Sequence, residues 1–133
     1  MHVPAPPGEV YRALDSDAGR ASFWAESAVE RDGHIEFRFV NGVEHRSRIL
    51  ERRPPARLVL EYFGARASFD LRDDGRGGTD LLLTHEGVPI EEWQEVHAGW
   101  LNVLFPLKAW VAFGIDLRNH DPARTWDDGY ADQ

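Results

Sequence analysis

The sequence predicts an α+β domain built from a run of antiparallel strands and one long helix. Between residues 34 and 86 apolar side chains alternate with polar ones, which is the period-two pattern of half-buried strands. From about residue 88 the apolar side chains recur every three or four residues, which indicates a helix. A chain of 133 residues has the length of one domain with a single core. We therefore expect a sheet and a helix that share this core.

Two short helices are expected before the sheet. Pro6-Pro7-Gly8-Glu9 begins a helix predicted over about 7–14, because proline in a first helical turn costs no hydrogen bond and Glu9 suits the positive end of the helix. A second helical stretch is predicted over 18–25, after a turn-prone segment. Its aromatic side chains, Phe23 and Trp24, are expected to face inward.

Hairpins link the strands that are predicted next. Asn41-Gly42 is the strongest hairpin signal, since a type I′ turn needs positive φ at both central positions. Phe63-Gly64 and the glycine-rich segment 73–78 indicate two further turns. Pro54-Pro55 ends the second strand, because proline cannot donate to a strand ladder. The predicted strands cover 34–40, 43–51, 57–62, 65–73 and 79–86.

One long helix is predicted over about 90–116. A continuous helix of this length measures about 40 Å, against about 23 Å for a seven-residue strand, so it must cross the sheet diagonally. Pro106 cannot bond to the carbonyl of Asn102, which predicts a kink near the middle. The expected organisation is therefore one domain over 1–116 and a polar C-terminal tail over 117–133.

The composition excludes several classes of protein. With 15 Lys and Arg against 23 Asp and Glu, the net charge is −8, and this charge repels phosphate backbones, so no nucleic-acid partner is expected. The absence of cysteine excludes disulfides, thiol nucleophiles and thiolate metal sites. No apolar run approaches the roughly 18 residues needed to span a bilayer, and the start of the chain lacks a signal-peptide pattern. A cytoplasmic protein with no membrane span is expected.

Three stretches resemble a known superfamily. The opening Val3-Pro4-Ala5-Pro6-Pro7-Gly8-Glu9-Val10-Tyr11-Arg12-Ala13-Leu14 is similar to the first strand end and first helix of the START-like superfamily, or SRPBCC, which includes polyketide cyclases and birch-pollen allergens. Gly77-Gly78-Thr79-Asp80-Leu81-Leu82-Leu83-Thr84-His85 and Gly99-Trp100-Leu101-Asn102-Val103-Leu104 resemble its bacterial branch named for the activator of heat-shock-protein ATPase. The resemblance covers about residues 3–116. It implies the helix-grip fold, in which a curved antiparallel sheet wraps around a long C-terminal helix, with two short helices near the N-terminus.

In a helix-grip fold the concave face of the sheet and the long helix enclose a cavity, so residues that point inward are candidate ligand contacts. Small-molecule sites are mainly apolar with a few polar groups, and His45, Ser47, Tyr62 and His85 form such a minority among the expected inward residues. The candidate ligand-binding residues are Trp24, Phe37, Phe39, His45, Ser47, Tyr62, Phe69, His85, Trp93, His97, Trp100 and Leu104.

The polar candidates have plainer explanations as well. A histidine on an apolar strand face is more often a hydrogen-bonded core residue than a ligand contact. His45, His85 and His97 lie on three predicted elements and could converge on a metal, but no two share an i, i+4 face with an acid. Ser47 lies about 7 Å from His45 along the strand, too far for direct proton transfer. We therefore assign no metal ligand, no cofactor and no catalytic residue.

Four functions remain open at this point. The first is binding of a hydrophobic or aromatic small molecule, without chemistry. The second is a polyketide-cyclase-like enzyme that uses Tyr62, His45 or His85 as acid and base, since the histidine pKa of about 6.5 lies near neutrality. The family name implies the third, a module that interacts with a chaperone. The fourth is a well-packed domain without a ligand-sized cavity, whose function lies in a partner interface.

Several aromatic residues predict an interface between two copies of the chain. Trp93, Trp110 and Phe113 lie partly off the inner stripe of the long helix, and exposed aromatic patches mark interfaces. In the tail, Trp126 and Tyr130 would gain from burial, either on the body or on a second subunit. A homodimer through the long helix or the tail is expected.

Overall fold

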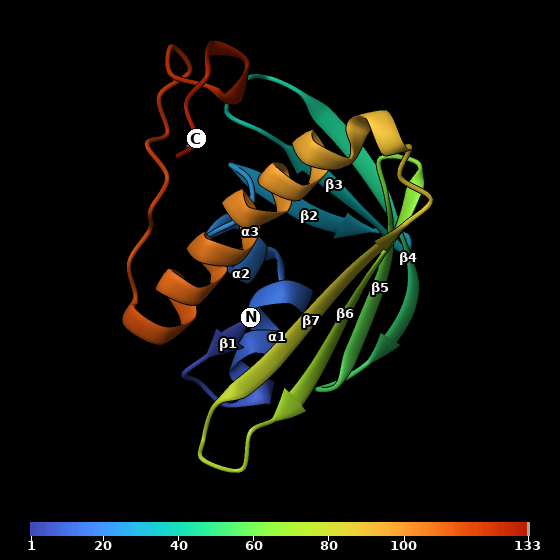
Figure 1. The fold of residues 1–133 in the computed structure, drawn as a ribbon, viewed down its shortest axis with the longest axis vertical. Helices are drawn as coiled ribbons and strands as arrows, with labels where there is room; N and C mark the ends of the chain where they lie inside the picture. The colour runs from blue at the N-terminus through green and yellow to red at the C-terminus, as the bar shows by residue number, and fades with distance from the viewer. Residues whose placement is uncertain (133) are drawn as a thin grey trace.

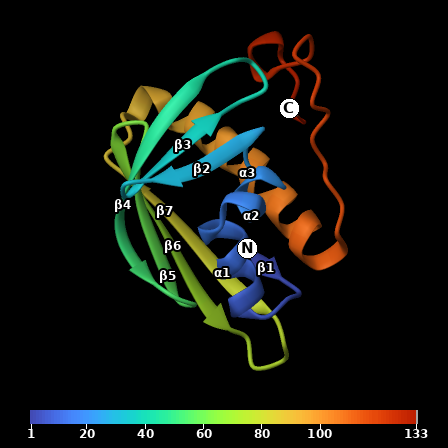
Figure 2. The same cartoon turned by 180° about the vertical axis from the view of Figure 1, so that it is seen from behind.

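The computed structural model describes residues 1–132 and has the helix-grip architecture (Figure 1). A curved antiparallel sheet faces the long helix α3, Trp93–Phe113, which crosses the sheet diagonally. Two short helices, α1 (Pro7–Asp15) and α2 (Asp17–Ala21), precede most of the strands. α1 packs against α3 and the middle of the sheet, and α2 packs against α1 and β2 (Ser27–Arg31). The view from behind shows both short helices on the same side of the sheet as α3 (Figure 2).

Seven strands form the sheet, in the spatial order β1-β7-β6-β5-β4-β3-β2. All neighbouring strands are antiparallel, so β2 to β7 form a meander and β1 adds to its far edge beside β7. The predictions of strands over 57–62, 65–73 and 79–86 are confirmed at both ends. The strands are β1 His2–Val3, β2 Ser27–Arg31, β3 His34–Arg38, β4 Glu44–Arg53, β5 Arg57–Tyr62, β6 Ala65–Asp73 and β7 Thr79–Glu86.

Strand β2 was not predicted, and the second helical stretch was predicted too long. α2 ends at Ala21, because the amides of Phe23, Trp24 and Ala25 all turn back to one acceptor, the carbonyl of Arg20. The chain then enters β2, which reaches β3 through a two-residue turn at Asp32 and Gly33, with φ of 50° and 73°. An Asp-Gly pair is a hairpin signal of the same strength as Asn-Gly.

The prediction of a type I′ turn at Asn41-Gly42 was wrong. Only Gly42 has a positive φ, of 80°, and its N–H donates to the carbonyl of Phe39, so the turn begins at Phe39, one residue earlier than a type I′ turn centred on Asn41-Gly42. β3 therefore ends at Arg38 and β4 begins at Glu44. The type I′ pattern occurs instead at Phe63 and Gly64, where φ is 48° and 77°.

The long helix is shorter than predicted. Residues 90–92 form a 3-10 turn, η1 (Ile90–Glu92), and α3 ends at Phe113 because Gly114 takes a left-handed conformation with φ of 67°. The helix continues through Pro106, and no helix in the described part of the chain is long and apolar enough to cross a membrane. After Gly114 the chain turns back beside α3 and reaches the β3–β4 turn (Figures 1 and 2).

The core lies between the concave face of the sheet and the inner side of the helices. Fully buried aliphatic side chains from α1, β5 and α3, such as Leu14, Leu60 and Leu107, fill the end nearest α1. Arg20 is also fully buried, and its guanidinium donates to the carbonyls of Leu14 and Ala28 and to Asp17. These bonds attach α2 to α1 and β2 and satisfy a charge that burial would otherwise penalise.

Candidate functional site

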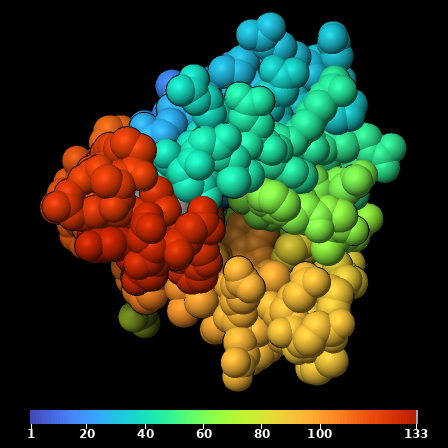
Figure 3. All heavy atoms as spheres, turned by 90° about the horizontal axis from the view of Figure 1, so that it is seen from above, coloured from blue at the N-terminus to red at the C-terminus, as the bar shows by residue number. Residues whose placement is uncertain are grey.

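The other end of the space between the sheet and α3 contains a cavity of about 290 Å³. Its mouth is visible as a hollow between the C-terminal segment, the β3–β4 and β5–β6 turns and the start of α3 (Figure 3). This volume is near the lower limit for small-molecule sites, which are mostly apolar clefts of about 300–1,000 Å³. The cavity is lined by Trp24, Ala25, Glu26, Phe39, Val40, Asn41, Val43, Tyr62, Phe63, His85, Glu95, Val96, Gly99, Trp100, Asn102, Val103, Arg118 and Trp126.

A cluster of aromatic rings forms the floor of this cavity. The ring of Trp24 lies 5.0 to 5.8 Å, centre to centre, from those of Phe37, Tyr62, Phe69 and Trp100. Most of these pairs are tilted or edge-to-face, the arrangements that aromatic rings prefer. Rings locked in this way present a rigid apolar surface to the cavity.

His85 is held neutral by its neighbours. The indole N–H of Trp100 donates to Nδ1 of His85 over 3.0 Å, and an indole nitrogen can only donate. Nδ1 therefore carries no proton, and Nε2 donates to the carbonyl of Tyr62 over 3.2 Å. Burial lowers the pKa of His85, although the bond to the Tyr62 carbonyl opposes this shift. Both ring nitrogens of His85 are thus occupied by the protein.

His45 supports the β5–β6 turn and does not line the cavity. Its Nε2 accepts a hydrogen bond from the backbone N–H of Phe63 over 3.1 Å, and its ring stacks on the Phe63 ring at 3.8 Å. Burial lowers the pKa of His45, and the charge of Glu61 opposes this shift only in part. His45 is therefore a neutral acceptor that fixes the rim of the cavity.

Two hydrogen-bond donors in the cavity wall have no protein acceptor among the described residues. The Tyr62 hydroxyl accepts the indole N–H of Trp24 over 3.1 Å, so its own proton stays available, and burial raises the pKa of this hydroxyl. The side-chain amide nitrogen of Asn102 is buried and unpaired. Since an unpaired buried donor costs about 1–3 kcal/mol, both groups would gain from an acceptor inside the cavity.

The sheet places the remaining strand candidates at different depths. Phe39 lines the cavity, whereas Phe37 and Phe69 lie behind the ring of Trp24. Ser47 is completely buried, with an unpaired hydroxyl, and does not reach the cavity wall. Of the strand residues proposed as ligand contacts, Phe39, Tyr62 and His85 reach the cavity.

The structure places three helix candidates, Trp93, His97 and Leu104, outside the cavity. Trp93 is 55% exposed, and its ring stacks on the exposed ring of His97 at 5.3 Å. The inner face of α3 includes Val96, and each further residue turns by about 100°, which takes His97 to the flank of the helix. Leu104 packs against the core beside the cavity. The three histidines 45, 85 and 97 do not converge, and the described residues contain no cluster of metal-ligating side chains.

Sequence reasoning missed several residues of the cavity wall. Gly99 and Asn102 belong to the stretch 99–104 that carries the family resemblance, so a signal for them was present. A Cβ atom added to Gly99 would meet no atom within 4 Å, which leaves open space at this point of α3. Arg118 and Trp126 come from the polar tail, where the sequence pattern gave no reason to expect a cavity wall.

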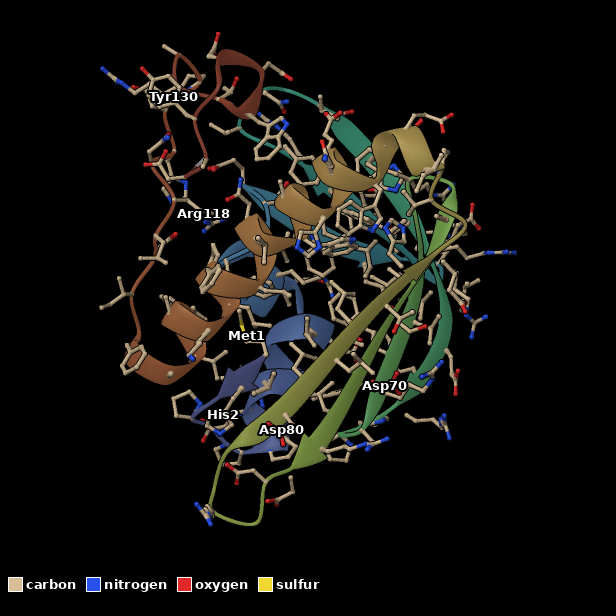
Figure 4. The ribbon with its side chains drawn as sticks, viewed as in Figure 1. Met1, His2, Asp70, Asp80, Arg118 and Tyr130 are labelled. Atoms are coloured by element: carbon tan, nitrogen blue, oxygen red, sulfur yellow. The ribbon has the colours of Figure 1, made fainter. Side chains whose placement is uncertain are left out.

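Arg118 attaches the C-terminal segment to the body beside the cavity (Figure 4). Its side chain is only 4% exposed and donates to the carbonyls of Ala21 and Ala25, each over 2.8 Å. Two further bonds join it to the carboxylate of Asp116. Burial opposes ionisation of Asp116, but the hydrogen bonds from Arg118 and His120 outweigh it and lower the pKa of this carboxyl.

Comparison with known proteins places this arrangement in a family. The family model described as Activator of Hsp90 ATPase homolog 1-like protein matches residues 4–112. The protein SSP2350 from Staphylococcus saprophyticus is similar with a TM-score of 0.74 and 19% identity, over 86% of this chain and 90% of that one. The Aha1 dimer from Colwellia psychrerythraea is similar with a TM-score of 0.73 and 21% identity, over 86% and 93%. The protein CV1439 from Chromobacterium violaceum has a TM-score of 0.66 and 26% identity, over 84% and 95%. None of the curated proteins matches this chain.

Proposed function

The chain belongs to the Activator of Hsp90 ATPase homolog 1-like protein family, and we propose that it binds a neutral aromatic or otherwise hydrophobic small molecule in the cavity between the sheet and α3. One observation carries this proposal. The cavity combines a floor of locked aromatic rings with two donors, Tyr62 and Asn102, that no acceptor within residues 1–132 satisfies. A flat ligand with an acceptor such as a carbonyl oxygen would cover the rings and pair with a donor.

The charges around the cavity favour a neutral ligand. Glu26 and Glu95 line the wall and would repel an anion. Arg118 is the cation of the wall, but its charge is already paired with the carboxylate of Asp116. The rim glutamates and the ring faces would attract a cation, but it would have to leave water, and these attractions repay only part of that desolvation cost.

The geometry gives less support to acid–base chemistry. His85 uses both ring nitrogens in bonds to the protein, and Nε2 of His45 is bonded outside the cavity wall. Tyr62, with a raised pKa, is a donor and a poor base. Activation of a chaperone ATPase would be carried over from the family name alone, and one fold hosts many functions.

Filling the cavity tests the proposal. The probe is Prodan, a neutral naphthyl ketone whose emission reports the polarity around it. Gly99→Leu projects a side chain into open space and should weaken saturable Prodan binding by at least about tenfold. The matched control is Gly8→Leu, a second helical glycine with open space at its Cβ but outside the cavity. Absence of saturable binding to the wild-type protein, or equal binding by Gly99→Leu, would contradict the proposal.

We also propose that two copies associate through the outer face of α3. Leu101, Phe105 and Phe113 are exposed there, the last two by 54% and 65%, and no other element of the described chain covers this face (Figure 1). Large exposed apolar patches mark interaction sites. The Colwellia relative is described as a dimer, which supports this assembly. Sedimentation should show a dimer that Phe105→Glu converts to a monomer, and a wild-type monomer at all concentrations would refute it.

A further inference from the structure

The C-terminal segment provides one wall of the cavity although it lies outside the part of the chain shared with the family. The family model ends at residue 112, whereas Arg118 and Trp126 line the cavity. In Figure 3 this segment borders the mouth directly. Whatever these residues do for a ligand therefore lies outside the part of the chain that the family model describes.

One anchor of the segment lies at its beginning. The ring of His120 bridges two carboxylates, with Nδ1 2.7 Å from Glu26 and Nε2 3.0 Å from Asp116. Arg118 lies between Asp116 and His120 in the chain, and its guanidinium donates to the carbonyls of Ala21, at the end of α2, and of Ala25. Because Glu26 itself lines the cavity, this anchor sits on the rim.

A second anchor lies at the other side of the mouth. The carboxylate of Asp127 accepts a hydrogen bond of 2.9 Å from the side-chain amide of Asn41, on the β3–β4 turn. A short 3-10 turn, η2 (Trp126–Asp128), is stabilised by reciprocal bonds between Thr125 and Asp128. This turn presents Trp126 to the cavity.

Between the two anchors the segment bonds mainly to itself. The amide of Asn119 donates to the carbonyl of Arg124 and to Asp132, and Asp121 accepts from the backbone of Ala123 and from the side chain of Arg124. A unit with its own internal bonds can leave the body without losing its local structure.

We propose that residues 116–128 form a strap that completes the ligand site, with Trp126 as the residue that covers the bound molecule and the two anchors as the contacts that release when it enters or leaves. This inference rests on the proposed function. Trp126 lines the cavity together with Trp24 and Trp100, so a bound ligand would contact aromatic side chains of both the strap and the body. The strap thereby slows the release of the bound molecule.

Two alanine variants of the same segment test the strap. Trp126→Ala removes the covering ring, and Tyr130→Ala removes an aromatic ring of the segment that is exposed and outside the cavity wall (Figure 4). Stopped-flow measurements with Prodan should show dissociation at least about tenfold faster from Trp126→Ala, whereas Tyr130→Ala should stay within about twofold of the wild type. Asp127→Ala, which removes the second anchor and leaves Trp126 in place, should also accelerate dissociation.

The outcomes distinguish a failure of the strap proposal from a failure of the proposed ligand binding. Saturable Prodan binding by the wild type with unchanged dissociation from both Trp126→Ala and Asp127→Ala would overturn the strap and leave the proposed function standing. Acceleration by Tyr130→Ala equal to that by Trp126→Ala would also overturn it, since the effect would then be general to the segment. Absence of saturable binding to the wild type would overturn the proposed function and the strap together.

Discussion

The two ends of the space between the sheet and α3 are built from different side chains. At the α1 end, flexible aliphatic groups such as Leu14 and Leu107 are completely buried and fill the volume. At the other end, aromatic rings enclose a cavity of about 290 Å³. The bonds from Trp24 to Tyr62 and from Trp100 to His85 hold these rings in place. Rings fixed by directional bonds cannot collapse into a gap as aliphatic side chains can, so the core remains hollow where the hydrogen bonds are.

We therefore expect substitutions at the packed end to lower the free energy of unfolding, and substitutions at the cavity end to change ligand binding. Leu107→Ala should therefore have the largest effect on folding, a loss of about 2–5 kcal/mol, because its side chain is fully buried in the packed end. Urea unfolding measures this loss, and Prodan affinity of the folded variant should stay close to the wild-type value. Leu82→Ala, at a 60% exposed leucine of β7, is the control. A loss as small as that of the control would show that the packed end is not what holds the fold.

Two helical glycines provide a sharper contrast. A Cβ at Gly19, in the packed end, would lie 2.4 Å from the carbonyl oxygen of Ala13, so Gly19→Ala should destabilise by about 1–3 kcal/mol. At Gly99 the same atom meets nothing within 4 Å, and Gly99→Ala should stabilise α3 by about 0.5–1 kcal/mol. Thermal unfolding should show a lower unfolding temperature for Gly19→Ala and a higher one for Gly99→Ala. A shift in the same direction for both variants would contradict the difference in packing between the two ends.

Removing one bond of the aromatic cluster should have a smaller effect. Trp100→Phe keeps a ring but loses the indole N–H that donates to His85, at a cost of about 0.5–1.5 kcal/mol. With Nδ1 free, the pKa of His85 should rise from its lowered value, which an NMR titration follows. The control is Trp110→Phe, on the exposed side of α3. An unchanged His85 titration would mean that Trp100 does not hold the imidazole neutral.

The smallest expected effect is a dependence of the strap on pH. Burial lowers the pKa of His120, but the hydrogen bonds to Glu26 and Asp116 outweigh burial and raise it. A raised pKa means that this contact stabilises the strap below the ordinary value of about 6.5 and is lost as the pH rises through the raised pKa. His85 and His45, whose pKa values are lowered, act in the opposite direction, since their contribution is lost as the pH falls below about 6.5.

An NMR titration of the histidine rings checks this prediction. His120 should titrate above the ordinary histidine pKa, and His85 and His45 below it. Prodan should dissociate faster as His120 loses its proton, and the effect should be modest because the ring is partly exposed and water screens its ion pairs. His120→Gln should remove this pH dependence. Faster dissociation at low pH, without a change at high pH, would contradict the role of His120 as an anchor.

Local pattern was sufficient for most of the fold. The alternation in 57–62, 65–73 and 79–86 and the three- and four-residue spacing in α3 determine which faces are apolar, because period two and period 3.6 admit different elements. Turn geometry was less determined. Asn41-Gly42 carries a hairpin signal as strong as any in the chain, yet the turn has another form, and the side chain of Asn41 bonds to Asp127 in the strap. A contact with a segment 86 residues away is not visible to a local rule.

The candidate site, too, could be predicted from the sequence only in part. The inward residues Tyr62, His85 and Trp100 follow from alternation and helical spacing, since these periods fix the direction of a side chain. Tertiary structure alone decided that the space beside Gly99 stays open. It also brought Arg118 and Trp126 from a polar tail to the mouth of the cavity. Direction along an element is a local property, whereas depth, empty volume and the approach of distant segments depend on how all the elements pack.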